Sequence, residues 1–262
     1  MCRLPGFATW PCDELNSLWR IGNGGYPNDA IPAERLRPRI RNRIRAAFRR
    51  QSRTSGCSVL VEKTCANCLR VDFVAQCFPE AMFVQIVRHP IDTIPSTLRR
   101  LSAPLDIGYL AKKARYVPAR HLPLAVVRSI RRRFVGPGQS AWGPVVPQQA
   151  LPPEKLTPSS YAAMQWIECV RGVDGFFDSR DQRNCHYVRY DDILDDAAGR
   201  LALLAEGLGK QIEYNHILSA TGAIRNHIVS KREILDASAI RTLMNHGSGT
   251  MERHGYALDG GH

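Results

Sequence analysis

Several patterns that would assign a protein to a class at once are missing from this sequence. No apolar run approaches the length needed to cross a bilayer. The first residues, MCRLPGFATWPCDELN, lack the basic stretch and following apolar stretch of a secretory signal. The nucleotide-binding pattern GxxxxGK[ST] is also absent. We therefore expect a protein without a membrane span, located in the cytoplasm.

The cysteines lack the spacing of a zinc site or a disulfide framework. Cys65 and Cys68 form a CxxC, but no second CxxC and no Cys/His pair stands at a suitable distance. Without a secretory signal, the eight cysteines are expected to be reduced thiols. We expect no metal site and interpret the CxxC as two small apolar residues at a helix start.

Acidic residues are scarce relative to basic ones, 24 against 36, so the net charge is +12. Such an excess favours anionic partners, including nucleic acid, anionic lipid and phosphorylated or sulfated small molecules. Nine arginines lie between Arg35 and Arg53. Apolar residues recur every four positions from Leu36 to Phe48, which predicts an amphipathic helix over 32–51. Its arginines either cover a solvated face or bind an anion.

Strand and helix patterns alternate through the first half of the chain. Residues 58–63 and 81–87 are short apolar runs typical of buried strands, and each precedes a helical pattern. Thr64 and Asp92 are the expected caps of these two helices. The alternation predicts a right-handed βαβ unit and an α/β fold with a parallel sheet.

One α/β domain is expected to cover residues 1–262. Residues 1–30 are rich in turn signals, and the proline-rich and glycine-rich segment 104–157 is expected to be an insertion or lid. The other expected elements are a helix at 161–177, a strand at 184–194 that runs into an acidic turn, and a helix at 197–209.

Cations follow three of the expected strands. Lys63 ends the first, Arg88 the second and Arg189 the third. In a parallel sheet, ligands bind at the carboxyl ends of the strands, so these cations are expected along one edge. Arg88 can contact a phosphate through two N–H groups, and Ser96 on the following helix can add a hydroxyl. The combination predicts an anion site.

The segment 61–100, VEKTCANCLRVDFVAQCFPEAMFVQIVRHPIDTIPSTLRR, resembles the centre of sulfotransferases that use 3′-phosphoadenosine 5′-phosphosulfate (PAPS). In that family, an arginine at a strand end and a serine eight residues later bind the 3′-phosphate of the nucleotide, and Arg88 and Ser96 match in type and spacing. The Lys63–Thr64 step matches as well. Further segments resemble bacterial members: WPCDELNSLWR, APLDIGYLAKKARYVP, AWGP, VRYDDIL and HGY.

The resemblance implies a P-loop-like three-layer α/β fold with a central parallel sheet. It also implies transfer of a sulfuryl group from PAPS to a hydroxyl or amine of a small molecule or saccharide. Catalysis of this kind depends on positioning and on charge stabilisation, as in phosphoryl transfer.

The resemblance also assigns roles to further residues. Glu14 stands near the place where the family carries its general base, although an acid at a helix start is also favoured by the helix dipole. Lys63 would neutralise charge on the transferred group, unless it is simply a surface lysine. Ser230 and Lys231 stand where the family has a loop that closes over the 3′-phosphate.

One family feature is not found. These sulfotransferases begin with a strand and an RSGT-like loop whose backbone N–H groups hold the 5′-phosphosulfate. Nothing similar precedes WPCDELN, and RTSGCS at 53–58 comes before a strand instead of after one. We expect the first strand and the phosphate loop to be missing, which would leave the sheet with unpaired edges. Either the natural chain starts upstream of Met1, or this is an inactive truncated form.

Two other classes of function compete. A non-enzymatic polyanion-binding protein, which could be an inactive sulfotransferase remnant, would rely on the arginine-rich helix and lose affinity steeply with salt. The sequence resembles no nucleic-acid-binding module, so no specific nucleic acid partner is expected. A P-loop kinase would need a Walker lysine and a magnesium-binding Ser/Thr, and neither is visible.

Overall fold

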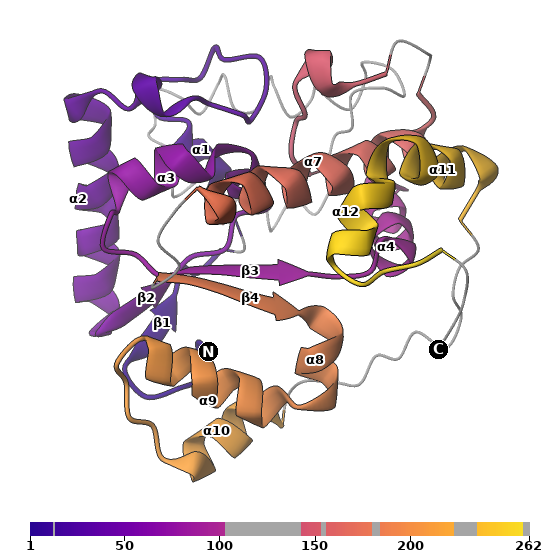
Figure 1. Ribbon diagram of the computed structural model, residues 1–262. Helices are drawn as coiled ribbons and strands as arrows, with labels where there is room; N and C mark the ends of the chain where they lie inside the picture. The colour runs from indigo at the N-terminus through magenta and orange to yellow at the C-terminus, as the bar shows by residue number, and fades with distance from the viewer. Residues whose placement is uncertain (13, 103–142, 153–155, 180–183, 223–234, 259–262) are drawn as a thin grey trace.

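The computed structural model of the chain describes residues 1–12, 14–102, 143–152, 156–179, 184–222 and 235–258 (Figure 1). Strands within these ranges form two separate parallel pairs. Strand β1 (Phe7–Thr9) pairs with β2 (Val59–Val61), and β3 (Phe83–Val87) pairs with β4 (Cys185–Arg189). The chain is therefore a mixed helix and sheet protein with parallel strands.

The two pairs correct the expected sheet arrangement. Both predicted strands are confirmed, and so is the helical connection between them, which consists of the 3-10 helix η2 (Cys65–Arg70) and α3 (Val71–Cys77). However, β2 pairs with β1, which the turn-rich reading of residues 1–30 missed. Among the described residues, β2 and β3 are not hydrogen-bonded to each other, so a continuous central sheet is not seen.

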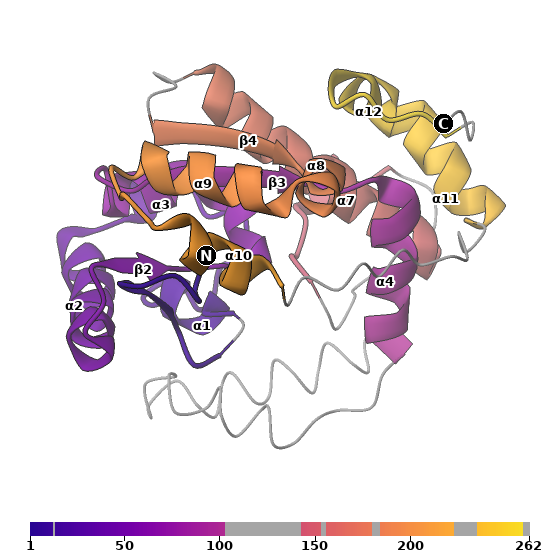
Figure 2. The same cartoon turned by 90° about the horizontal axis from the view of Figure 1, so that it is seen from below.

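Helices cover both faces of the β3–β4 pair (Figures 1 and 2). On one face, Gln85 of β3 donates a hydrogen bond to Asp174 of α7 (Pro158–Asp178). On the other face, His186 of β4 lies against Gly207 at the end of α9 (Ala197–Gly207). Helix α4 (Pro90–Ser102) follows β3 and packs against α7. Both α7 and α9 confirm helices that the sequence predicted.

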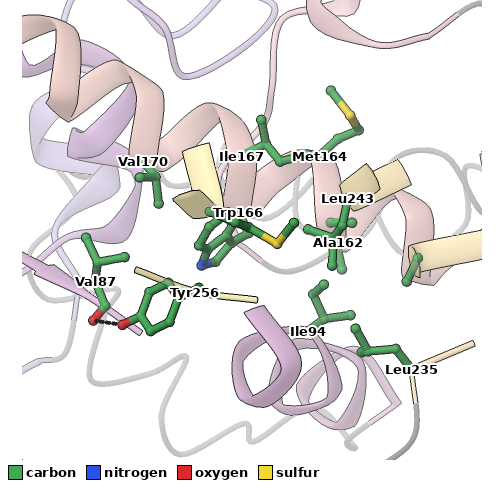
Figure 3. Packing of buried hydrophobic residues seen from close by; sticks show 13 residues of the cluster. Val87, Ile94, Ala162, Met164, Trp166, Ile167, Val170, Leu235, Leu243 and Tyr256 are labelled. Carbon is green, nitrogen blue, oxygen red and sulfur yellow. Dashed lines mark hydrogen bonds between the residues drawn. The ribbon is translucent and has the colours of Figure 1, made fainter. Parts of the chain in front are cut away.

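The main apolar core lies between α7, α4 and the C-terminal helices (Figure 3). Its fully buried members include Ile94, Ile167 and Leu243. Helix α7 begins with a capping box in which Thr157 and Ser160 bond each other's backbone N–H groups, and Pro158 occupies the first turn.

Helix α2 (Pro38–Ser55) confirms the predicted amphipathic helix and its buried face. Ile44 is fully buried, and Phe48 packs against Trp10, Trp19 and Phe78. The helix starts later than expected, because the 3-10 turn η1 (Ala33–Arg35) precedes it and Pro38 occupies its first turn.

Neither expected cap forms. Helix α4 begins at Pro90, so Asp92 lies inside the first turn, and His89 Nδ1 accepts the N–H of Ile91 instead. The Thr64 hydroxyl makes no capping bond, because it donates to Glu62 and accepts the Leu15 N–H at 2.8 Å.

Shorter elements complete the described chain. They are α1 (Asn16–Trp19), η4 (Gln148–Ala150), α8 (Tyr190–Asp195), α10 (Tyr214–Thr221), α11 (Ala237–Thr242), the π-helical turn η6 (Leu243–Gly247) and α12 (Ser248–Arg253). None of the described helices is long and apolar enough to cross a bilayer. Most of the predicted insertion at 104–157 lies outside the described residues.

Candidate functional site

Arg88, Asp92 and Ser96 form a stripe at the start of α4. They are spaced i, i+4 and i+8, so Asp92 and Ser96 share one helix face. Arg88 precedes the helix and reaches the same face, because its Nε lies 3.7 Å from Asp92 Oδ2. The structure therefore brings the two predicted phosphate-binding residues to one side of α4.

The Arg88 guanidinium contacts the Tyr190 ring and the Asp92 carboxylate. It lies over the ring of Tyr190 at 4.8 Å, and its side chain is 30% exposed. At 3.7 Å the contact with Asp92 is an ion pair but too long for a hydrogen bond. The buried Nε has no hydrogen-bond partner within the part of the chain that the structure describes. This N–H is therefore a buried donor whose hydrogen bond is not satisfied by the described residues.

Ser96 differs from its hydroxyl-bearing neighbours on α4. Thr93 and Thr97 donate their hydroxyls to the carbonyls of His89 and Thr93, each at 3.0 Å. The described residues offer no such partner to the half-buried Ser96. Its hydroxyl can therefore serve a ligand beside Arg88.

Arg189 ends β4 beside Arg88 but turns to the opposite face. Val87 is in register with Arg189, and side chains alternate along strands, so Arg189 shares the face of Val87. Its guanidinium lies over the Tyr256 ring at 5.0 Å and is 3.5 Å from Asp191. Lys63 follows β2 in the other strand pair, so the expectation that Lys63, Arg88 and Arg189 line one edge stays a prediction.

Glu14 and Lys63 meet around Cys65. The Cys65 thiol donates a hydrogen bond to Glu14, and burial together with the Glu14 charge raises the pKa of this thiol to about 12, while Lys63 opposes the rise. Glu14 is half-buried and Lys63 is exposed. No hydrogen bond or ion pair among the described residues joins this group to Arg88 or Ser96.

Two other predicted site residues, Ser230 and Lys231, lie outside the described residues. The described cysteines are all free, and no group of three or more His, Cys, Asp or Glu side chains in the described ranges could hold a metal ion.

The comparisons with known proteins decide the family. A model described as the sulfotransferase family matches residues 5–139, more than half of the 262 residues. The chain belongs to the sulfotransferase family. A solved structure of a sulfotransferase domain from the curacin biosynthetic pathway is similar over 82% of this chain and 69% of its own, with 14% identity and a TM-score of 0.46. A search of curated proteins found no match.

The matched range of the family includes Glu14, Lys63, Arg88 and Ser96. The resemblance read from residues 61–100 is thereby confirmed at the level of the family. Arg189 and Tyr256 lie beyond the matched range.

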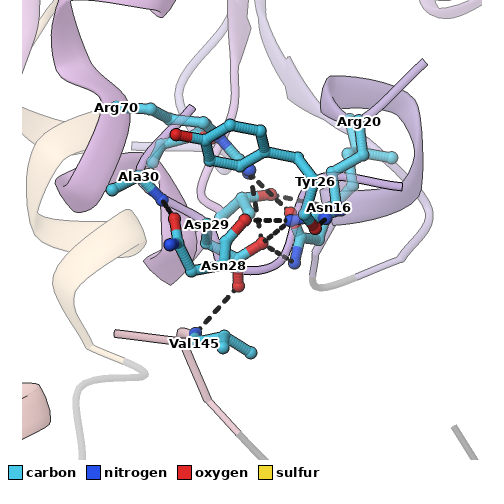
Figure 4. A network of polar contacts seen from close by, with 11 residues as sticks. Asn16, Arg20, Tyr26, Asn28, Asp29, Ala30, Arg70 and Val145 are labelled. Atoms are coloured by element: carbon cyan, nitrogen blue, oxygen red, sulfur yellow. Dashed lines mark hydrogen bonds and ion pairs between the residues drawn. The ribbon is translucent and has the colours of Figure 1, made fainter. Parts of the chain in front are cut away.

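A buried polar network in this sulfotransferase family member was missed by sequence reasoning (Figure 4). Asp29 is fully buried and pairs with Arg20 at 2.6 Å and with Arg70 at 3.5 Å. The Asp29 oxygen that pairs with the arginines, Oδ1, also accepts a hydrogen bond from Asn16 at 3.2 Å, and the other oxygen, Oδ2, accepts the Val145 N–H at 2.9 Å. The network ties the loop after α1 to η2 and to the chain at Val145.

A second missed group links α7 to the C-terminal segment. His254 Nε2 lies 3.0 Å from Asp174 Oδ2, and its Nδ1 lies 3.0 Å from the Tyr187 hydroxyl. Burial alone would raise the pKa of Asp174, but hydrogen bonds from His254 and Gln85 and the Arg253 charge hold it below its usual value. The only sequence signal was the HGY motif, which carries no information on Asp174.

Proposed function

We propose that this chain takes a sulfuryl group from PAPS and transfers it to a hydroxyl or amine of a small molecule or saccharide. The proposal rests on the state of Arg88. Its buried Nε lacks a hydrogen-bond partner among the described residues, and its side chain reaches the face of α4 that carries Ser96. A phosphate fits this pair, since a guanidinium and a hydroxyl both donate to its oxygens.

Arg88 and Ser96, which donate hydrogen bonds, suit the 3′-phosphate of the nucleotide. Asp92 and Tyr190 hold the Arg88 side chain in place before a ligand arrives, which reduces the entropy lost on binding. Ser230 and Lys231 are proposed to close over the same phosphate. Bound PAPS would supply an activated sulfuryl group.

Glu14 and Lys63 are the proposed groups on the acceptor side. Glu14 would accept the proton of the acceptor as a general base. Lys63, the exposed cation near it, would stabilise negative charge on the transferred group. Their common position around Cys65 supports a shared role.

The proposed fold is P-loop-like, with the two strand pairs as halves of one parallel sheet. The lack of pairing between β2 and β3 supports a missing strand between them, and the loop after β1, WPCDEL, does not resemble the family's phosphate loop. Hydrogen exchange of backbone amides tests this arrangement. The amides of β2 and β3 on the edge that lacks a neighbouring strand should exchange quickly. Slow exchange at both edges would contradict it.

The test of the proposed function is binding of adenosine 3′,5′-bisphosphate, compared with adenosine 5′-monophosphate, which lacks the 3′-phosphate. The wild-type chain should prefer the bisphosphate, and Arg88→Ala should weaken that binding by about tenfold or more, as expected for the loss of a charged hydrogen bond. Arg241→Ala, at an exposed arginine of α11, is the matched control. Calorimetry that finds no preference in the wild type would refute the 3′-phosphate site.

Polyanion binding is a second candidate, and α2 supports it. Exposed arginines without an ion-pair partner among the described residues cover the helix, and α2 contains no acidic residue. By contrast, Arg45 pairs with Glu80 at 2.7 Å. The exposed arginines of this surface are Arg39, Arg41, Arg43, Arg49, Arg50 and Arg53. Such a surface suits an acidic saccharide chain, including one that serves as the acceptor.

A further inference from the structure

We propose that Tyr256 is a positioning residue for the anion site, holding the Val87 backbone through its hydroxyl and the His89 side chain through its ring. The inference rests on the proposed role of Arg88. Tyr256 does not approach the α4 face of Arg88 and Ser96. It acts from the opposite face of β3, through the two residues that flank Arg88 in the chain.

Residues 87–89 are held by hydrogen bonds from distant segments, two to backbone carbonyls and one from the His89 side chain. The Tyr256 hydroxyl donates to the Val87 carbonyl at 3.1 Å (Figure 3). Trp166 Nε1 of α7 donates to the Arg88 carbonyl at 2.9 Å. His89 Nε2 lies 3.1 Å from the Ala257 carbonyl. Three consecutive residues, 87 to 89, therefore take their positions from α7 and from the C-terminal segment.

The Tyr256 ring adds packing to these bonds. It lies 4.7 Å from the His89 ring, between centroids, and carries the Arg189 guanidinium at 5.0 Å. Tyr256 is only 4% exposed. Burial is the largest of the effects that raise the pKa of its hydroxyl, so the group stays protonated and remains a donor to the Val87 carbonyl.

The sequence turns Tyr256 toward β3 through the end of α12. Tyr256 N–H bonds the Met251 carbonyl and Gly255 N–H bonds the Glu252 carbonyl, which is the Schellman pattern. Gly255 has a φ of +67°, and a Cβ at this position would lie 3.4 Å from Arg189 Nη1. His254, the residue before the turn, is anchored to Asp174 and Tyr187. The anchor, the turn and the ring together place the hydroxyl on Val87.

Tyr256→Phe tests the proposal, because it removes the hydroxyl and retains the ring. Calorimetry on the full chain should find bisphosphate affinity lowered roughly three- to tenfold, the value of one hydrogen bond. Affinity for adenosine 5′-monophosphate should be unchanged, since Arg88 acts on the 3′-phosphate. Tyr214→Phe, at a 62% exposed tyrosine of α10, should bind both nucleotides as the wild type does.

The outcomes separate this inference from the proposed function. Wild-type affinity for the bisphosphate in Tyr256→Phe would overturn the positioning role alone, as would an equal loss for both nucleotides, which indicates general destabilisation. A wild-type chain that does not prefer the bisphosphate would overturn the 3′-phosphate site and this inference with it. His254→Gln, which releases the anchor without touching residues 87–89, should reproduce the selective loss.

Discussion

The carboxylate of Asp174 on α7 and the imidazole of His254 after α12 are joined by a hydrogen bond of 3.0 Å between Oδ2 and Nε2. Both side chains are buried, and Gln85 of β3 donates to the same carboxylate at 2.8 Å. One carboxylate thus connects a helix, a strand and the C-terminal segment. Removing this carboxylate should destabilise the region around β3 and β4.

Asp174→Asn should lower the free energy of unfolding at neutral pH by about 1–3 kcal/mol, because it weakens buried hydrogen bonds to a charged group. The pKa of Asp174 is lowered in the folded state, so its contribution is present above the pKa of the unfolded chain and disappears as the pH falls through the folded value. Urea denaturation should therefore find a difference between variant and wild type that narrows in acid. Asp195→Asn, at an exposed acid of α8, is the control and should change the free energy of unfolding little. An equal difference at all pH values would contradict the assignment.

Asp29→Asn should be more damaging. It leaves Arg20 and Arg70 buried without their counter-charge, a change that costs about 3–5 kcal/mol in buried ion pairs. Burial already lowers the pKa of Arg70 to about 10 even with Asp29 beside it. Glu80→Gln, which breaks the exposed pair with Arg45, should cost below about 1 kcal/mol. Equal costs for the two variants in denaturant melts would refute this view of the network.

Glu14→Gln should lower the turnover of an active form by about a hundredfold while nucleotide affinity stays unchanged, since general bases contribute at this level. The readouts are sulfuryl transfer to an acceptor and calorimetry with adenosine 3′,5′-bisphosphate. Glu34→Gln, at an exposed acid of η1, is the matched control. An unaffected rate in Glu14→Gln would remove Glu14 from the mechanism and leave it as the partner of Cys65.

The combined change Arg39→Gln, Arg43→Gln and Arg50→Gln should lower the salt concentration at which the chain elutes from immobilised heparin. These arginines are exposed and make no ion pair within the described chain. Each arginine removed should therefore reduce the slope of the logarithm of the binding constant against the logarithm of the salt concentration by about one. Arg45→Gln should elute closer to the wild type, because Glu80 already neutralises Arg45. Identical elution of the triple variant and the wild type would exclude α2 as the binding surface.

Local patterns predicted the elements that bury a regular apolar stripe or run. Helices α2, α7 and α9 were anticipated because their periodicity extends over many residues, and strand β3 was anticipated because it lies in a short apolar run. Strand β1 was missed because it has only three residues among turn signals. Its pairing with β2 bridges about fifty residues, and a short window of sequence carries no information on such a contact.

The site was predictable in part for the same reason. Arg88 and Ser96 share one strand-to-helix unit, so their position on one side of α4 follows from spacing alone. Asp29 lies in a loop whose letters, NGGYPND, indicate only a turn, and its partner Arg70 is forty-one positions away. Asp174 and Tyr256 were missed for similar reasons. Their partners come from packing between elements, which no local pattern encodes.

The hydrogen bond from Tyr256 to Val87 spans 169 positions of the chain. During synthesis, which proceeds from the N-terminus, β3 leaves the ribosome long before Tyr256 is made. The backbone around Arg88 cannot reach its final geometry until a segment 169 positions later in the chain has been made. A nascent chain arrested before α12 would contain both residues proposed to bind the phosphate, Arg88 and Ser96, and would still lack the hydrogen bond to the Val87 carbonyl.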